Sequence, residues 1–121
     1  MYTLKKRFTF EAAHFLPHHD GKCRRLHGHS WEGWVEVEGE QIQVSGPQAG
    51  MVVDFGELSR ALQPLLDEYL DHYCLNDTLG IESPTSEAVA KWVFDRLVES
   101  DVPVSSITIA ETCTSICSYR A

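Results

Sequence analysis

The chain has 121 residues and a formal net charge of -8, with 43% hydrophobic residues, as expected for one globular domain over residues 1–121. The acidic charge disfavours a general nucleic-acid-binding protein, which needs Lys and Arg to neutralise phosphates. No apolar run approaches the ~20 residues of a membrane span, and the N-terminus lacks the apolar stretch of a signal peptide, so we expect a cytoplasmic location.

The first two predicted elements are strands at residues 2–15 and 27–38. One face of the first strand carries Leu4, Lys6, Phe8, Phe10, Ala12 and His14. The corresponding face of the second carries His27, His29, Trp31, Gly33, Val35 and Val37. Because side chains alternate along a strand, antiparallel pairing would bring the three histidines together. Three protein ligands and one open position are typical of catalytic zinc, although two histidines can also simply begin a strand.

A polar loop at residues 18–25 joins these strands and contains Lys22, Cys23, Arg24 and Arg25. Neighbouring cations favour the thiolate form of Cys23, which then could act as a fourth metal ligand, a nucleophile or a proton acceptor. A local basic pocket in an acidic protein suits a small polyanion such as a nucleotide or polyphosphate. The other cysteines are Cys74, Cys113 and Cys117, and we expect all four to be free thiols in a reducing compartment.

An amphipathic helix is predicted after the turn-rich residues 39–50. Asp54 is a suitable N-cap with Glu57 at the capping-box position, and apolar residues repeat at three and four up to Tyr69. Pro64 should kink or split this helix. Beyond it, Asp71 precedes His72, and a carboxylate there could orient the imidazole; the alternative is a helix C-terminal histidine favoured by the dipole.

The remaining elements are a helix opened by residues 83–87 and ended by 102–103, a strand at 105–112, and a last strand through Tyr119. The order ββααββ predicts an α+β domain whose four-stranded antiparallel sheet carries both helices on one face. Such a small open sheet leaves two edges exposed, and exposed edges pair with other chains. We therefore expect a homo-oligomer built by strand-to-strand contacts.

Glu111 continues the apolar row of Ile107 and Ile109, so it is predicted to face the core. A buried carboxylate is costly unless it is paired or hydrogen-bonded. It can accept two parallel hydrogen bonds from the amino-pyrimidinone edge of guanine or a pterin. The alternative is a salt bridge to Arg120.

Five segments, in chain order, resemble the 6-pyruvoyl-tetrahydropterin synthase superfamily. They are Phe8–His14, Cys23–His29, Leu70–Asn76, Pro84–Glu87 and Glu111–Thr112. The short gap between Cys23 and His27 resembles the bacterial 6-carboxytetrahydropterin synthase branch of queuosine biosynthesis, whereas pyruvoyl-forming members usually have a longer gap there.

The resemblance implies a role for each matching residue. The implied zinc ligands are His14, His27 and His29. Cys23 would be the proton acceptor, and Asp71 with His72 would form a proton relay that Glu111 completes, unless Glu111 anchors the pterin ring instead. Thr85, Ser86 and Glu87 match a Thr-Thr-Glu segment that helps to hold the pterin, with serine replacing the second threonine.

The resemblance also implies a tunnelling fold (T-fold), in which trimers close a barrel of antiparallel strands, two trimers stack into a hexamer, and active sites lie between subunits. The implied reaction is a lyase conversion of 7,8-dihydroneopterin triphosphate to 6-carboxytetrahydropterin, acetaldehyde and triphosphate. The alternatives are a pyruvoyl-forming synthase with the same metal, a non-catalytic pterin-binding module, and a structural zinc site closed by Cys23.

Overall fold

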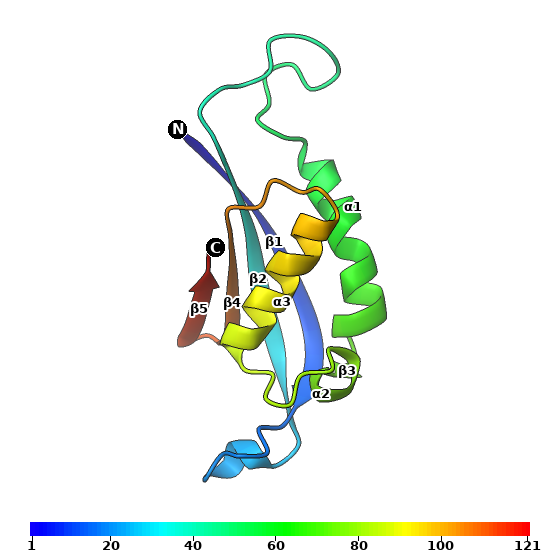
Figure 1. Ribbon diagram of the computed structural model, residues 1–121, viewed down its shortest axis with the longest axis vertical. Coiled ribbons are helices and arrows are strands. Elements are labelled where there is room, and N and C mark those ends of the chain that lie inside the picture. Colours follow the sequence, from blue (N-terminus) through cyan, green and yellow to red (C-terminus); the bar gives the residue numbers. More distant parts are fainter.

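The computed structural model describes residues 1–121 and contains one five-stranded sheet in the order β3-β1-β2-β4-β5 (Figure 1). The four long strands pair antiparallel, as predicted; they are β1 (Tyr2–His14), β2 (His27–Gly39), β4 (Ser106–Thr112) and β5 (Ser115–Tyr119). β3 (Tyr73–Cys74) pairs parallel with β1. The sheet therefore has a fifth, parallel strand that was not predicted.

Two hydrogen bonds attach the residues just before β3 to β1. The Glu11 N–H donates to Asp71 Oδ1 over 2.9 Å, and the His72 N–H donates to the Glu11 carbonyl over 2.5 Å. The residues that follow are thereby fixed along the free edge of β1. β3 pairs only with Ala12 and Ala13, so most of that edge of β1 has no neighbouring strand within the chain.

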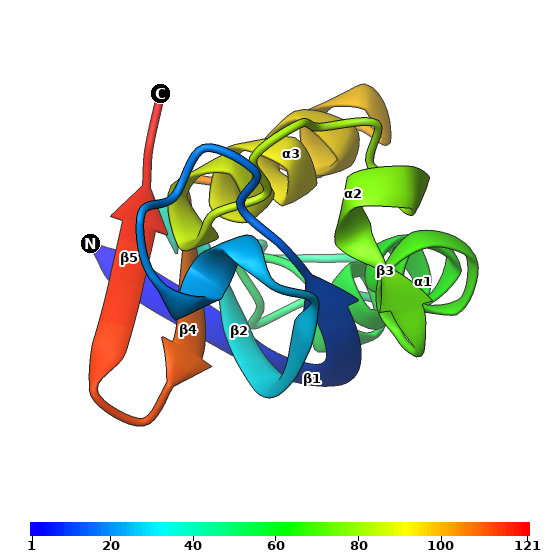
Figure 2. The ribbon, with the colours of Figure 1, turned by 90° about the horizontal axis from the view of Figure 1, so that it is seen from below.

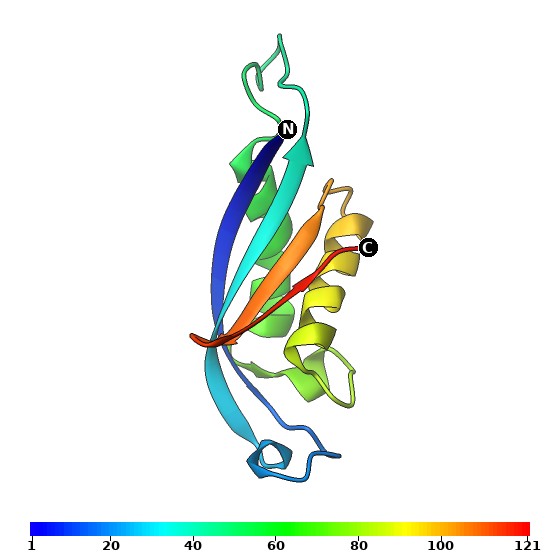
Figure 3. The same ribbon diagram turned by 90° about the vertical axis from the view of Figure 1, so that its left-hand side faces the viewer.

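The two long helices, α1 (Phe55–Leu65) and α3 (Ser86–Glu99), cover one face of the sheet, as predicted (Figures 1 and 3). Two short helical segments were not predicted: the 3-10 turn η1 (Lys22–Arg24) and α2 (Leu75–Thr78). The π-helical turn η2 (Leu66–Leu70) covers the end of the helix that was predicted up to Tyr69. None of the helices has the length and apolar character that a membrane crossing requires.

The predicted start of α1 is correct, but its capping box is only half formed. Asp54 caps the helix by accepting from the Gly56 N–H over 2.8 Å, whereas the Glu57 carboxylate accepts from Gln48 instead of returning to Asp54. Pro64 lies inside the last turn of α1 and has no N–H to donate. Directly after it the chain changes to the wider hydrogen bonding of η2, as expected for a helix split by proline.

The core lies between the sheet and the two helices and follows the predicted alternation. Phe8, Phe10 and Ala12 on β1 are buried, as are Trp31 and Val35 on β2. Gly33 pairs with Phe8, and a Cβ at Gly33 would collide with the Phe8 ring, so only glycine fits under this aromatic side chain. The rows continue to the histidines at the ends of both strands.

Asp101→Gly is expected to stabilise the fold by about 0.5–1 kcal/mol, because Asp101 holds a left-handed backbone (φ 62°) after α3, where glycine has no Cβ penalty. The Asp101 N–H donates to Val98 and the Val102 N–H to Leu97, so both bonds of this helix end are kept. Urea unfolding measures the change. Asp95→Gly, at an exposed mid-helix position of α3, is the control and should destabilise; a loss of stability at position 101 would contradict the prediction.

Candidate functional site

The three predicted histidines converge at one end of the β1–β2 hairpin. His14 is the last residue of β1 and pairs with His27, the first residue of β2, while His29 pairs with Ala12. The ring centroids are 4.6 Å apart for His14–His27, 5.2 Å for His14–His29 and 4.9 Å for His27–His29. One ligand nitrogen from each ring lies within 4.8 Å of the others. The predicted convergence is confirmed, and metal ligation by these rings stays a prediction.

Backbone carbonyls set the orientation of two of these rings. His14 Nδ1 donates to the Pro84 carbonyl over 2.8 Å, and His27 Nδ1 donates to the Arg25 carbonyl over 2.7 Å. Each ring therefore presents Nε2, with its lone pair, toward the centre of the cluster. Metal-binding histidines commonly donate their other ring nitrogen in this way. Sequence reasoning missed both acceptors, because every residue has a backbone carbonyl and the sequence does not show which of them lies beside a histidine ring.

The Nε2 atom of His14 is buried and has no hydrogen-bond partner. Burial of the ring lowers the pKa of His14, against opposing contributions from the Pro84 carbonyl and Glu111, so the imidazole is neutral at neutral pH. A buried, unprotonated nitrogen without a partner is costly. A cation between the three rings would satisfy it. Three imidazole nitrogens are a ligand set that zinc takes in proteins.

Glu111 faces the cluster from β4, as its place in the apolar row predicted. Its Oε1 lies 3.2 Å from His14 Nε2 and 3.8 Å from His29 Nε2. The pairing of β4 with β5 shifts register between Ala110 and Thr112, and such a bulge re-aims the intervening side chain. The carboxylate oxygen thus faces a neutral imidazole lone pair, which again favours a proton or a cation between them.

The alternative partner for Glu111 is wrong. The guanidinium of Arg120 lies at the other end of β5, where its Nη1 is 3.6 Å from Glu38 Oε1. The side chain of Glu111 is one-quarter exposed, so it has access to a ligand entering the cluster from solvent.

Asp71 and His72 form a pair at the edge of β1. His72 Nδ1 is 3.0 Å from Asp71 Oδ2, and the other oxygen of Asp71 binds the Glu11 N–H. His72 holds a left-handed backbone with φ 68°, a conformation that is costly for a residue with a Cβ and that concentrates at functional sites. The aspartate contacts the imidazole, as predicted, and His72 also directly follows Asp71, the C-cap of η2, so the helix-terminus alternative stays open.

A hollow of about 510 Å³ lies beside His72, at the edge of the β1–β2 hairpin. Its lining includes both His72 and His29, together with Glu11, Ser30 and Tyr73. The Ser30 hydroxyl donates to the Glu11 carboxylate over 2.6 Å on the wall of this cavity. Sequence reasoning missed Glu11 and Ser30. Both lie on the face of the hairpin opposite the core, where polar residues are expected whether or not they have a function.

Asp71→Asn is expected to remove a pH-dependent part of the stability. The hydrogen bond from the Glu11 N–H holds the pKa of the Asp71 carboxyl below its ordinary value. Partial burial opposes this shift of the pKa, and His72 adds to it. Such a group stabilises the fold above its unfolded pKa of about 4, and this stabilisation is lost as the pH falls through the folded pKa. Since the side chain is 41% exposed, we expect only about 0.5–1 kcal/mol at neutral pH.

Urea unfolding of the wild type and of Asp71→Asn at about pH 7 and about pH 3 measures this difference in stability. The gap between the two proteins should shrink at the lower pH. A gap of the same size at both values would contradict the assignment. Asp95→Asn is the matched control, since Asp95 is a surface carboxylate that pairs with Lys91 within α3.

Cys23 lies in η1, within the loop that joins β1 to β2. Its side chain is half-buried, and its carbonyl accepts from the Leu16 N–H over 2.8 Å. The converging metal-ligand group contains the three histidines and not Cys23, which disfavours a closed four-ligand structural site. Lys22, Arg24 and Arg25 are exposed on the same loop, and none of them pairs with a carboxylate.

Thr85, Ser86 and Glu87 form the start of α3 at the same end of the molecule. Thr85 caps the helix by accepting from the Ala88 N–H, as predicted, and the preceding Pro84 carbonyl is the acceptor for His14. Seen from below in Figure 2, the β1–β2 loop, β3, α2 and the start of α3 gather at this end. The histidine cluster and the predicted pterin segment are therefore linked by the hydrogen bond from His14 to Pro84.

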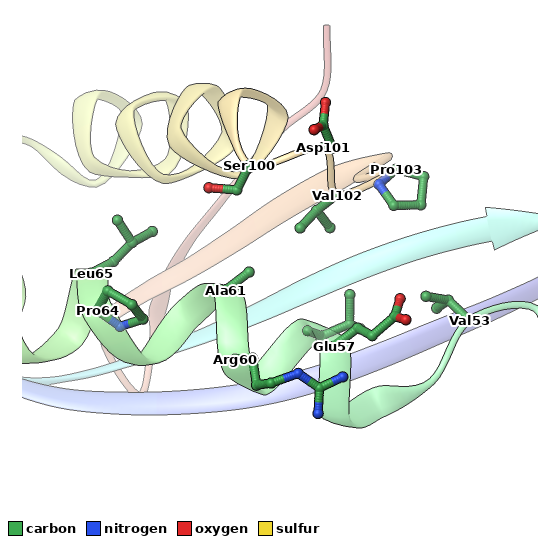
Figure 4. Close-up of a pocket in the computed structure, with 11 residues that line it drawn as sticks. Val53, Glu57, Arg60, Ala61, Pro64, Leu65, Ser100, Asp101, Val102 and Pro103 are labelled. Carbon is green, nitrogen blue, oxygen red and sulfur yellow. The ribbon is translucent and has the colours of Figure 1, made fainter. Parts of the chain in front are cut away.

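Another cavity, of about 450 Å³, lies between α1 and the segment after α3 (Figure 4). Its lining includes Glu57, Arg60 and Asp101, and it contains none of the predicted site residues. The end of the molecule that holds the histidine cluster is therefore the candidate site.

The chain is similar to known proteins over nearly its whole length. The family model described as 6-pyruvoyl tetrahydropterin synthase matches residues 3–121. A Synechocystis sp. protein named 6-carboxy-5,6,7,8-tetrahydropterin synthase is 54% identical over 98% of this chain and 93% of its own. A Haemophilus influenzae protein of the same name is 33% identical over 99% of both. The structure of Caenorhabditis elegans 6-pyruvoyl tetrahydropterin synthase superposes with a TM-score of 0.84 at 30% identity, covering 99% of this chain and 95% of that one.

Proposed function

Since the chain belongs to the 6-pyruvoyl tetrahydropterin synthase family, we propose that it is a lyase of the 6-carboxy-5,6,7,8-tetrahydropterin synthase type. The observation that carries the choice of product is the 54% identity to a relative with that name, against 30% to the structure with the pyruvoyl name. The short gap between Cys23 and His27 supports the same choice. The product would serve queuosine biosynthesis.

The proposed substrate is 7,8-dihydroneopterin triphosphate, and the proposed products are 6-carboxytetrahydropterin, acetaldehyde and triphosphate. The proposed metal is zinc, held by Nε2 of His14 and Nε2 of His27 together with the His29 ring. Bound there, zinc would polarise side-chain oxygens of the substrate and acidify the adjacent C–H or O–H.

We assign the proton transfers to Cys23 and His72. Cys23 would accept a proton from the substrate side chain, because the cations beside it on the loop favour its thiolate. His72 would donate or accept the second proton, with its ring held by Asp71 Oδ2 at 3.0 Å.

The pterin ring would lie between Glu111 and the start of α3. The Glu111 carboxylate can accept two hydrogen bonds from the amino-pyrimidinone edge, and its partial exposure beside the cluster supports this role. Thr85, Ser86 and Glu87 would hold the ring from the other side. Lys22, Arg24 and Arg25 would meet the triphosphate, which the lack of carboxylate partners on this loop supports.

We also propose that the working form is a homo-oligomer, a trimer or a dimer of trimers with active sites between subunits. Most of the outer edge of β1 has no neighbour in the chain, and β5 forms the opposite free edge of the sheet. Unpaired edges of this length are stable in water only when covered or blunted. Edge-to-edge pairing of copies would cover both.

The test is incubation of the zinc-loaded protein with 7,8-dihydroneopterin triphosphate, followed by mass analysis of the pterin and an acetaldehyde assay. Formation of 6-carboxytetrahydropterin with acetaldehyde supports the proposal. Pyruvoyl-tetrahydropterin without acetaldehyde would identify the pyruvoyl-forming alternative. Tight pterin binding without turnover would identify a non-catalytic binding module.

A further inference from the structure

Asn76 joins the segments that hold His14 in place. It lies in α2, and its side-chain amide pairs with both backbone groups of Phe15, the residue after His14. The Phe15 N–H donates to Asn76 Oδ1 over 3.0 Å, and Asn76 Nδ2 donates to the Phe15 carbonyl over 2.8 Å. The Asn76 amide thus makes two hydrogen bonds to the backbone directly after the end of β1.

The second amide proton of Asn76 reaches the segment before α3. Nδ2 also donates to the Glu82 carbonyl over 3.1 Å, two residues before Pro84, whose carbonyl accepts from the His14 ring. One side chain therefore fixes the backbone beside His14 and the loop that carries the acceptor for its ring. The distance between these two segments sets the direction of His14 Nε2.

The same clamp extends to Cys23. Phe15 is followed by Leu16, whose N–H donates to the Cys23 carbonyl over 2.8 Å. His18 Nε2 also lies 2.6 Å from Glu82 Oε1, but both of those side chains are about three-quarters exposed, so this contact adds little to the clamp. The amide of Asn76 is half-buried and uses one acceptor and both donor protons.

We propose that Asn76 is a positioning residue for the metal centre, acting through Phe15 and Glu82 on the orientation of His14 and through Leu16 on the place of Cys23. Only an amide offers an acceptor and two donors in one plane at this length. A carboxylate of the same shape would keep the Phe15 N–H bond and face two carbonyl oxygens with no proton to share. This inference rests on the metal centre proposed above.

The test compares wild type with Asn76→Asp and Asn76→Ser, using zinc affinity from competition with a chromophoric chelator and the absorption spectrum of the cobalt-substituted proteins. Both variants should bind zinc about 10–100-fold more weakly, the range found for residues that orient metal ligands. They should also show altered cobalt bands and a lower kcat with KM changed less.

Thr78→Val is the matched control. Thr78 lies in the same short helix and tethers it by donating to the Tyr69 carbonyl over 2.6 Å, with no link to His14. It should lose thermal stability while its zinc affinity and cobalt spectrum stay within about twofold of wild type, a change that corresponds to less than half a kcal/mol.

The outcomes separate the inference from its premise. If wild type binds no zinc, the proposed metal centre fails and the inference fails with it. If wild type binds zinc and both Asn76 variants bind it equally well, only the positioning role is overturned. Failure of both variants to fold, judged by circular dichroism at low temperature, also overturns it, because Asn76 would then belong to the fold alone.

Discussion

Cys23→Ala is expected to lower turnover by about 10²–10⁴-fold, the contribution of a positioned general base, while zinc content and pterin affinity stay close to wild type. The thiol lies in η1, outside the group of three histidines, and it accepts no hydrogen bond that the fold needs. Removing it therefore takes away proton transfer without removing a ligand. Steady-state kinetics, zinc content and equilibrium pterin binding measure the three quantities separately.

Cys113→Ala is the matched control for this experiment. Cys113 is an exposed free thiol in the turn between β4 and β5, and its loss should leave kcat and KM unchanged. Full activity of Cys23→Ala would remove the proton-acceptor role. Loss of zinc from Cys23→Ala would instead show that the thiol is a fourth ligand, contrary to the three-histidine site.

His29→Ala is expected to lower zinc affinity by more than about 100-fold, which exceeds the usual effect of residues that only orient a ligand, and to abolish turnover. His29 is the better choice of ligand for this test, since its side chain is 22% exposed whereas His14 is 1% exposed. Substitution at His29 leaves a smaller void in the core, so folding should persist. Chelator competition and thermal unfolding with and without zinc measure the effect.

His18→Ala serves as the control for metal removal. Its imidazole is three-quarters exposed and pairs with Glu82 outside the histidine cluster. Zinc should raise the melting temperature of wild type and of His18→Ala to the same extent and should leave His29→Ala unchanged. A zinc-dependent shift of full size in His29→Ala would falsify the three-histidine site.

Alternation of side chains was enough to predict the four long strands, and apolar spacings of three and four together with cap residues predicted the two helices over them. The rows ending in His14 and starting at His27 have a period of two, and the fold follows that period up to the cluster. β3 could not be predicted, because two residues carry no pattern and its place depends on hydrogen bonds between Asp71, His72 and the distant Glu11. Such bonds depend on the fold already formed.

The side chains of the candidate site could be predicted from the sequence, but the hydrogen bonds that hold them in place could not. His14 and Glu111 each continue an apolar row on a strand. A polar group in such a row is costly unless it has a partner or a ligand, so both positions could be predicted as site residues. The Arg120 alternative failed because sequence proximity along β5 does not say toward which face or end a long side chain points. The amide clamp of Asn76 depends on three backbone positions far apart in the chain, which no local pattern encodes.

The three histidines belong to one hairpin, whose arms are joined by residues 15–26 alone. Contacts so local in sequence close with little loss of chain entropy, whereas Asp71, His72 and Glu111 must arrive from much further along the chain. The order of assembly during folding should follow that difference in loop length. The hairpin that carries the three histidines is therefore expected to close early in folding, while the Pro84 carbonyl that orients the His14 ring joins it only later.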